Sequence, residues 1–321
     1  MRQLAGFVSA LAIGLAADTA PGEEAWPSRT ITFIVPYAAG GYTDLVARMA
    51  ARYVEGALGK TVIVDDRAGA GGIVGTQALA NAPGDGYTFC VCSIGAVSIA
   101  PFIQKVGYDP VKDLAPVGIV SQIPQVVIVR KDLPVKTMAE LATYAKAHPG
   151  KLNYGSSGAG GLTHYSVELF LARTGATAVH IPFKGGAQST AAVVAGDVDF
   201  SFANLTDALP QVEGGSVRGI AVTSRERSSY FADLPTVHES VLPDFIVETW
   251  NGIMAPPATP ASIIRKMSEI LIRMADDPAM KESMRKAGAE PVKATPEAYR
   301  AQIAQEIARW KPLIAEIAEK K

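Results

Sequence analysis

The sequence is poor in cysteine, in histidine and in net charge. Its 321 residues include two cysteines and four histidines, and 30 Lys and Arg residues stand against 31 Asp and Glu residues, for a formal net charge of −1. Two cysteines are too few for a disulfide framework or a four-thiolate zinc site. A balance near zero lacks the basic surplus that nucleic-acid binding needs. We therefore expect no nucleic-acid partner and no such metal site.

The chain also lacks a long apolar run beyond its first residues, although apolar side chains are plentiful. Hydrophobic residues make up 48% of the sequence, which also holds 30 glycines and 21 prolines. This composition is typical of a globular protein rather than a disordered one. A chain of this length exceeds the size at which a single hydrophobic core stops growing, so about two domains are expected.

Residues 1–20 show the pattern of a secretory signal peptide. Arg2 precedes an apolar stretch over 4–17, small residues follow, and Pro21 would end any helix. The stretch is too short to span a bilayer, which takes about 20 apolar residues. We predict that residues 1–20 are a signal peptide and that the mature protein is periplasmic. The alternative is a buried N-terminal helix.

From residue 30 onward, short apolar strands alternate with helices. The first strand, 31–35, is a near-continuous apolar run, and the helix after it is expected to be capped by Thr43 and ended by Gly59. Further strands are expected at 61–64, 87–93, 126–129, 152–154, 179–182, 198–202 and 217–222. Further helices are expected at 137–147, 162–173, 187–195 and beyond Pro260. This alternation predicts an α/β protein with parallel sheets.

Glycine-rich turns lead from strands into helices. They lie at 38–44, 69–75, 156–164 and 184–189. The first N–H groups of a helix lack partners and carry partial positive charge, and glycine lets an anion approach them closely. Each turn alone is also explained as a tight turn, but the set favours a carboxylate site. The segment 35–41 is echoed by 181–186, which fits two lobes of like construction with a cleft between them.

Templates for catalysis and cofactor binding are incomplete. The segment 155–158 misses a nucleophile elbow by one position, and 69–75 has one residue too many for a dinucleotide fingerprint. No histidine has metal-ligand spacing. Cys90 and Cys92 share one face of a strand; a redox or metal pair is one interpretation, and two buried small residues are the favoured one. We predict no catalytic residue, no metal and no cofactor.

At these residues the sequence resembles the substrate-binding proteins of tripartite tricarboxylate transporters, the Bug family. The matching stretches run in order along the chain at 26–27, 34–44, 67–72, 85–88, 153–158, 184–186, 235–239, Trp250 and 255–257. The resemblance implies a two-lobe fold of the type II periplasmic binding protein kind, with mixed, mostly parallel sheets and a ligand cleft between the lobes. The expected lobes are 26–122 with 247–321, and 123–246. They would close about strands near 120–121 and 247–250.

The resemblance further implies a non-enzymatic receptor that captures a small organic acid and delivers it to membrane transporter subunits. The acid would be a dicarboxylate, a tricarboxylate or an aromatic carboxylate, and a monomer is expected. On the first lobe the implied ligand-binding residues are Tyr37, Ala39, Gly41, Tyr42 and Thr43. On the second lobe they are Ser156, Ser157, Thr163, His164, Lys184, Ala203 and Asn204. Taken alone, His164 is more simply a local cap and Lys184 an exposed turn residue.

One position departs from the family pattern. Many relatives carry Asp where this chain has Ala203, just before Asn204. An acidic side chain there would receive a ligand ammonium or hydroxyl group, so we expect a hydroxyl-free diacid or an aromatic acid rather than an amino acid. Two other functions stay open: a periplasmic sensor subunit that presents a carboxylate to a membrane kinase, and an enzyme on the same fold.

Overall fold

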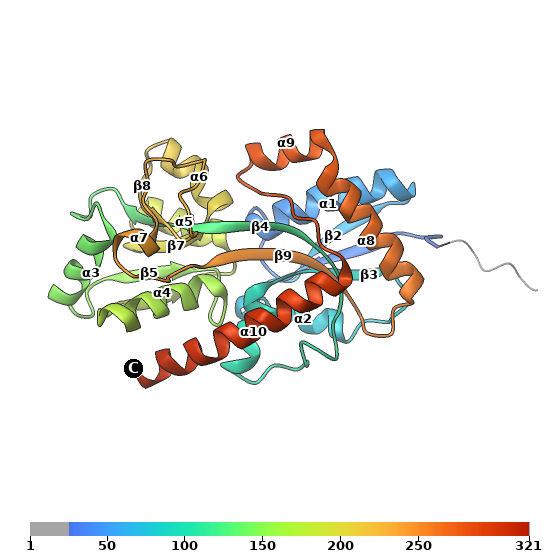
Figure 1. Cartoon of the computed structure of the whole chain (residues 1–321), viewed down its shortest axis with the longest axis horizontal. Helices are drawn as coiled ribbons and strands as arrows, with labels where there is room; N and C mark the ends of the chain where they lie inside the picture. Colours follow the sequence, from blue (N-terminus) through green and yellow to red (C-terminus); the bar gives the residue numbers. More distant parts are fainter. Residues whose placement is uncertain (1–25, 321) are drawn as a thin grey trace, which may run out of the picture.

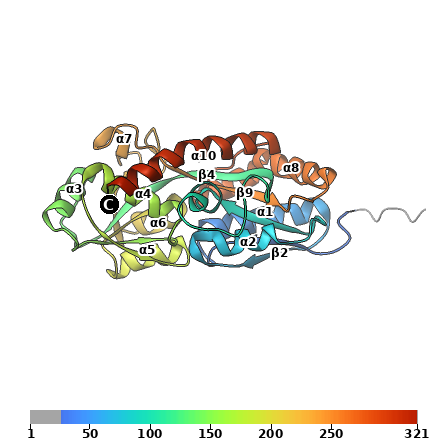
Figure 2. The same cartoon turned by 90° about the horizontal axis from the view of Figure 1, so that it is seen from below.

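Residues 26–320 are described by a computed structural model of the chain (Figure 1). The predicted signal peptide lies outside these residues. The described part is an elongated α/β molecule in which strands run along the long axis and helices cover them (Figures 1 and 2). The N-terminal segment, in blue, shares one end with the orange helices near the C-terminus, and the green and yellow middle of the chain forms the other end. The predicted two-lobe α/β fold is confirmed.

The first lobe is built on three parallel strands. β1 (Ile31–Val35) pairs with β2 (Val62–Asp66) on one side and with β3 (Thr88–Ser93) on the other. The connections are α1 (Tyr42–Leu58) and α2 (Ile73–Ala80). β1 is almost wholly buried, which explains its continuous apolar sequence. Shorter helical turns lie at Ala70–Gly72, Gly95–Ile99 and Ala100–Phe102.

The second lobe repeats this design. β5 (Asn153–Ser156) lies between β6 (Val179–Pro182) and β7 (Phe200–Asn204), and both pair with it in parallel. The remaining strand of this lobe is β8 (Val217–Val222). Its helices are α3 (Met138–Ala147), α4 (Leu162–Thr174), α5 (Gly186–Ala195), α6 (Leu205–Glu213) and α7 (Val237–Ser240).

Two long antiparallel strands carry the chain between the lobes. β4 (Ala115–Arg130) pairs with β9 (Glu248–Ala255) over its first part and with β7 and β8 over its last part, so it belongs to both lobes. β9 also pairs with β3. The register between β4 and β9 shifts between Ile119 and Ser121. The expected parallel pairings are therefore the outer ones, and the centre of the mixed sheet is antiparallel.

Three helices complete the chain and connect its two ends. They are α8 (Ala261–Asp276), α9 (Pro278–Lys286) and α10 (Pro296–Glu319). α10 runs along the molecule from the first lobe toward the second (Figures 1 and 2). There Glu316 lies 3.5 Å from Arg173 of α4. Within residues 26–320, no helix has the length and apolar character to cross a bilayer.

Most expected elements are present, with small shifts at their ends. Gly59 ends α1 in the left-handed conformation, as predicted. The prediction that Thr43 caps α1 is wrong: Gly41 is the capping residue, and Thr43 lies in the first turn. β4 extends well beyond the strand expected at 126–129 and includes the strand expected near 120–121. The helix α6, which contains Pro210, was not predicted.

Cys90 and Cys92 point to the same side of β3, as the strand periodicity predicts. Both are fully buried free thiols in one hydrophobic cluster, with 2.9 Å between their sulfur atoms. Burial raises the pKa of the Cys90 thiol well above its usual value. This environment fits the favoured interpretation of two buried small residues.

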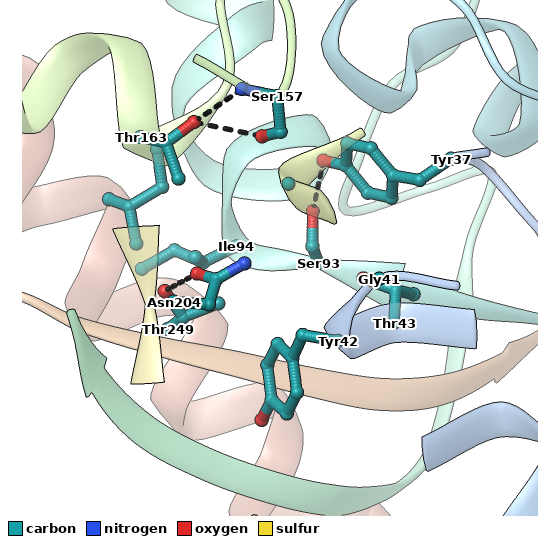
Figure 3. Close-up of a pocket in the computed structure, with 12 residues that line it drawn as sticks. Tyr37, Gly41, Tyr42, Thr43, Ser93, Ile94, Ser157, Thr163, Asn204 and Thr249 are labelled. Carbon is teal, nitrogen blue, oxygen red and sulfur yellow. Dashed lines mark hydrogen bonds between the residues drawn. The ribbon is translucent and has the colours of Figure 1, made fainter. Parts of the chain in front are cut away.

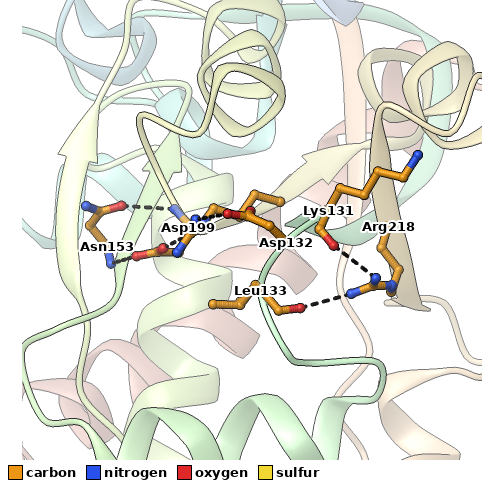
Figure 4. Close-up of polar contacts among 7 residues, drawn as sticks. Lys131, Asp132, Leu133, Asn153, Asp199 and Arg218 are labelled. Carbon is orange, nitrogen blue, oxygen red and sulfur yellow. Dashed lines mark hydrogen bonds and ion pairs between the residues drawn. The ribbon is translucent and has the colours of Figure 1, made fainter.

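A polar network ties the end of β4 to the rest of the second lobe (Figure 4). The Asp199 carboxylate accepts hydrogen bonds from Arg130 Nε and from the Asn153 amide, each at 2.8 Å. Arg218 of β8 donates to the carbonyl oxygens of Lys131, Leu133 and Val135. These bonds satisfy carbonyl groups in the loop after β4 that do not pair with a neighbouring strand. They therefore fix the path of the chain where it leaves the sheet.

Candidate functional site

A small cavity lies where the two lobes meet, beyond the carboxyl ends of β1, β3, β5 and β7. The first lobe contributes Tyr37, Gly41, Tyr42, Thr43, Ser93 and Ile94, and the second Ser157, Leu162, Thr163, Gly186 and Asn204, with Thr249 from β9 (Figure 3). The cavity volume is about 20 Å³, roughly the space of one water molecule. In open α/β sheets this edge is where ligands bind.

Tyr37 anchors the wall of the first lobe. Its hydroxyl donates to the Gly71 carbonyl oxygen at 2.9 Å and lies 2.7 Å from Ser93 Oγ. Burial raises the pKa of Tyr37 to about 12, so the hydroxyl is neutral and keeps its proton as a donor. The side chain thereby joins the loop after β1 to the end of β3.

Hydroxyl and amide groups form the opposite wall. Thr163 Oγ1 accepts from the Ser157 amide at 2.9 Å and lies 2.8 Å from Ser157 Oγ, which closes the turn between β5 and α4 (Figure 3). Thr249 Oγ1 donates to Asn204 Oδ1 at 3.0 Å and joins β9 to the start of α6. No Lys or Arg side chain is among the residues that line the cavity.

The helices that begin at the cavity lack side-chain caps. α1, α4 and α5 start after Gly41, Gly161 and Gly185, and α6 starts after Asn204, with no capping hydrogen bond from these side chains. Thr or Asp side chains cap α3, α7, α9 and α10, while α2 and α8 also lack a side-chain cap. An uncapped helix start offers free N–H groups and about half a positive charge. The cavity is thus suited to an anion without any basic side chain.

Asp207 brings a carboxyl group to the same junction. Its Oδ1 accepts from the Tyr42 amide at 3.0 Å, across the lobes, and its Oδ2 accepts from Asn204 Nδ2 at 3.2 Å. The side chain is buried in α6, with 9% of the residue exposed. Desolvation raises the pKa of Asp207 to about 7, although both hydrogen bonds act to lower it.

The lobes are in direct contact around the cavity. The Ala38 amide of the first lobe donates to the Lys184 carbonyl oxygen of the second at 3.0 Å. Gly71 faces Gly158 so closely that a Cβ atom at Gly158 would lie 2.7 Å from the Gly71 nitrogen. Glycine is therefore required where these two backbones meet. The described conformation is a closed one.

The predicted site residues divide into two groups. The cavity is lined by Tyr37, Gly41, Tyr42, Thr43, Ser157, Thr163 and Asn204. The residues that lie outside its lining are Ala39, Ser156, His164, Lys184 and Ala203. A role in ligand binding stays a prediction for both groups.

The residues outside the lining have other partners. Ser156 Oγ lies 2.6 Å from His180 Nε2, and the His164 ring stacks on His180 with centroids 3.9 Å apart. His164 Nδ1 also accepts from the Gly160 amide at 3.2 Å, which is the local capping role. Ala203 is buried in the core. Ala39 and the Lys184 side chain are exposed.

Several lining residues were not predicted. They are Ser93, Ile94, Leu162, Gly186 and Thr249. Ser93 ends a predicted strand and Gly186 lies in a predicted glycine-rich turn, so the sequence pattern could have indicated both as site residues. Thr249 could not be found in this way because β9 passes between the lobes. Position 203 is Ala, but Asp207, a few residues on, supplies a carboxyl group beside the cavity and was not predicted.

Known proteins show the same fold and sequence pattern. Residues 46–318 match the model of the tripartite tricarboxylate transporter family receptor. BugT of Bordetella pertussis is 35% identical over 97% of this chain and 94% of its own length. R. palustris Rpa4515 with adipate superposes with a TM-score of 0.88 at 32% identity, covering 91% of this chain and 98% of that one.

Two further structures agree. The periplasmic binding protein BugD gives a TM-score of 0.87 at 34% identity, covering 91% of this chain and 99% of that one. MatC from Rhodopseudomonas palustris with bound malate gives 0.86 at 30% identity, covering 90% and 100%. Sequence and structure lead to one assignment: this chain belongs to the Bug family of tripartite tricarboxylate transporter receptors.

Proposed function

We propose that this chain is a periplasmic receptor that captures a small organic acid and passes it to the membrane subunits of a transporter. The observation that carries the proposal is the meeting of four uncapped helix starts at one cavity between the lobes. Such a site binds a carboxylate through amide N–H groups, each helix start contributing about 0.3–2 kcal/mol. Binding without chemical change to the ligand is the expected activity.

The ligand class follows from the same groups. Relatives of this fold hold adipate and malate, which are dicarboxylates. Here the helix starts of both lobes face the cavity, so a diacid can be held at each end by a different lobe. We propose a di- or tricarboxylate or an aromatic carboxylate as the ligand.

Binding requires the lobes to separate. A cavity of about 20 Å³ is too small for an organic acid. We propose that 26–122 with 247–321 and 123–246 move as two lobes about β4 and β9. The register shift of β4 near Ser121 places an irregular segment at this point.

A binding screen tests the proposal. The purified mature protein is mixed with a panel of mono-, di- and tricarboxylates and aromatic acids, and its melting temperature is measured. A ligand that binds only the folded state raises the melting temperature. Calorimetry on the positive acids then compares Thr163→Val, which removes a hydroxyl group from the cavity, with Thr143→Val on the exposed face of α3.

We expect binding to weaken at least tenfold in Thr163→Val, since a lost hydrogen bond to a charged group is worth about 1.5–3 kcal/mol. Thr143→Val should bind as the wild type does. A panel in which no organic acid stabilises the protein would contradict the proposal. So would turnover of a bound acid, which would indicate an enzyme.

A further inference from the structure

The Asp207 carboxyl group lies between two helix starts that face each other across the lobes. A Cβ atom at Gly41, the cap of α1, would lie 3.5 Å from the Ala187 nitrogen and 3.7 Å from the Gly186 nitrogen of α5. A Cβ atom at Gly186 would overlap Asp207 Oδ2. Two helix starts at this distance repel each other, and a negative group between them offsets that repulsion. Asp207 thus occupies the kind of position that an anionic ligand would occupy.

The Tyr42 amide is already engaged by this side chain. It is one of the first N–H groups of α1, and it donates to Asp207 Oδ1 at 3.0 Å. An acid bound against the start of α1 would therefore approach the carboxyl group of Asp207 closely. Two carboxylates at such a distance disfavour each other's charged form.

The surroundings offer Asp207 no compensating cation. In the first turn of α1 the titratable groups are the Tyr42 phenol and Asp44, and Asp44 is paired with Arg48 at 2.7 Å. The sequence of α5 has no titratable side chain, and Lys184 before it is exposed. No ion pair of Asp207 is found within residues 26–320, and its partners are the Asn204 amide and the Tyr42 backbone. A proton is the simplest way to neutralise this carboxylate.

We propose that Asp207 couples ligand capture to proton uptake, so that an anionic ligand is closed into the cavity together with a protonated Asp207. The inference rests on the proposed function, because it takes the ligand to be an anion. The reaction joins the receptor with ionised Asp207, the ligand anion and one proton from solvent. The proton neutralises the carboxyl group, and the ligand carboxylate supplies the negative charge between the helix starts.

The pH dependence follows with a definite sign. Burial in the closed form raises the pKa of Asp207 to about 7, whereas a solvated Asp has a pKa near 4. The closed form is therefore most favoured below about pH 4, and this advantage is lost as the pH rises through about 7. A nearby ligand anion raises the pKa of Asp207 further, so the pH range over which this advantage is lost moves upward.

Calorimetry in two buffers of unlike ionisation enthalpy tests the coupling. Adipate and malate are titrated into the wild type, Asp207→Asn and Asp197→Asn at several pH values from 6 to 8. Asp197→Asn removes an equal charge from an exposed position of the same lobe. For the wild type and Asp197→Asn we expect uptake of up to about one proton per ligand, and an affinity that falls by up to about tenfold per pH unit.

Asp207→Asn should bind with no buffer-dependent heat and with an affinity independent of pH. The inference is overturned if Asp207→Asn keeps the pH slope, or if the wild type binds an acid without proton uptake. A measurement on the carboxyl group itself separates this inference from the proposed function and does not depend on the variant. The Asp207 carboxyl carbon of the wild type is followed by NMR against pH, without ligand and with an acid that calorimetry shows to bind. A titration midpoint that rises on saturation with the acid supports the inference, and a midpoint that binding leaves unchanged overturns it.

Discussion

At the scale of single residues, Gly186 leaves no room for a larger side chain beside Asp207. Its missing side chain leaves the space that Asp207 Oδ2 occupies, and its own N–H lies near the start of α1. The φ angle of Gly186 is not in the left-handed region, so the requirement for glycine here comes from space and not from backbone conformation. A methyl group would displace the Asp207 side chain without straining α5 itself.

We predict that Gly186→Ala weakens ligand binding at least tenfold, because a Cβ atom there would overlap the Asp207 carboxyl group. Calorimetry measures the affinity and small-angle scattering measures the degree of closure. The matched control is Gly56→Ala, at an exposed position of α1 with nothing within 4 Å of the added atom. That substitution should leave binding unchanged and stabilise the fold by about 0.5–1 kcal/mol. Equal affinities for both variants would contradict the prediction.

The sequence predicts single site residues only where they follow a recognisable strand-to-helix turn. Tyr37, Gly41 and Thr163 lie in such turns and do line the cavity. Asp207 lies inside a helix that was not predicted, because Pro210 interrupts its pattern. Its burial depends on contact with α1 of the other lobe. The residues around Asp207 in the sequence do not indicate a contact with a segment so far away along the chain.

At the scale of helices and strands, stability and binding are assigned to different helix starts. Thr137 Oγ1 accepts from the Glu140 amide at 3.1 Å, and the Glu140 carboxylate accepts from the Lys136 amide at 2.6 Å. Thr137 thus caps α3, and the Glu140 carboxylate binds the backbone of the residue before the cap. At the cavity, α4 and α5 begin at glycine residues without a side-chain cap, and the first N–H of α1 is donated to Asp207.

We predict that Thr137→Ala lowers the free energy of unfolding by about 1 kcal/mol, because it removes the cap of α3. The ligand affinity should not change, since α3 begins outside the cavity. Urea unfolding gives the stability, and Thr143→Ala, an exposed site of the same helix, is the control. A loss of the same size in both variants would show that the cap is not the cause.

We predict that Arg218→Met destabilises the second lobe by about 1–2 kcal/mol, because the carbonyl oxygens of Lys131 and Val135 lose the guanidinium donor while most of the aliphatic stem remains. Hydrogen exchange should become faster in the segment 131–135. Exchange in β1 and β2 should stay as in the wild type, since these strands lie in the other lobe. Unchanged exchange after β4 would contradict the assigned role (Figure 4).

The strands and helices were predictable where the apolar residues of a segment follow a single pattern. β1, β6 and β8 have the expected bounds, because each is a short run between turn residues. β4 is longer than expected, since its first part contains Gly118, Ser121 and Pro124, which interrupt the apolar pattern. These residues lie where β4 crosses between lobes, so pairing with β9 and not local propensity makes that segment a strand.

At the scale of the whole molecule, closure can be locked by a covalent bond. A Cβ atom at Gly185 would lie 3.5 Å from the Ala38 Cβ atom across the lobes, and disulfides require about 3.5–4.5 Å between these atoms. We predict that oxidised Ala38→Cys/Gly185→Cys neither takes up nor releases the ligand, and that reduction restores binding. The single variant Ala38→Cys, treated with the same oxidant, is the control. Normal exchange of ligand by the oxidised double variant would show that binding does not require opening.

The small cavity also affects any affinity that is measured. If the receptor also closes on about 20 Å³ without ligand, an acid cannot enter that state. The apparent dissociation constant is then the intrinsic one divided by the fraction of open molecules. Substitutions outside the cavity lining, along the contact of Gly71 with Gly158, would shift this fraction alone. Such variants would change the association rate for every ligand by one common factor, and the order of preference among acids would stay the same.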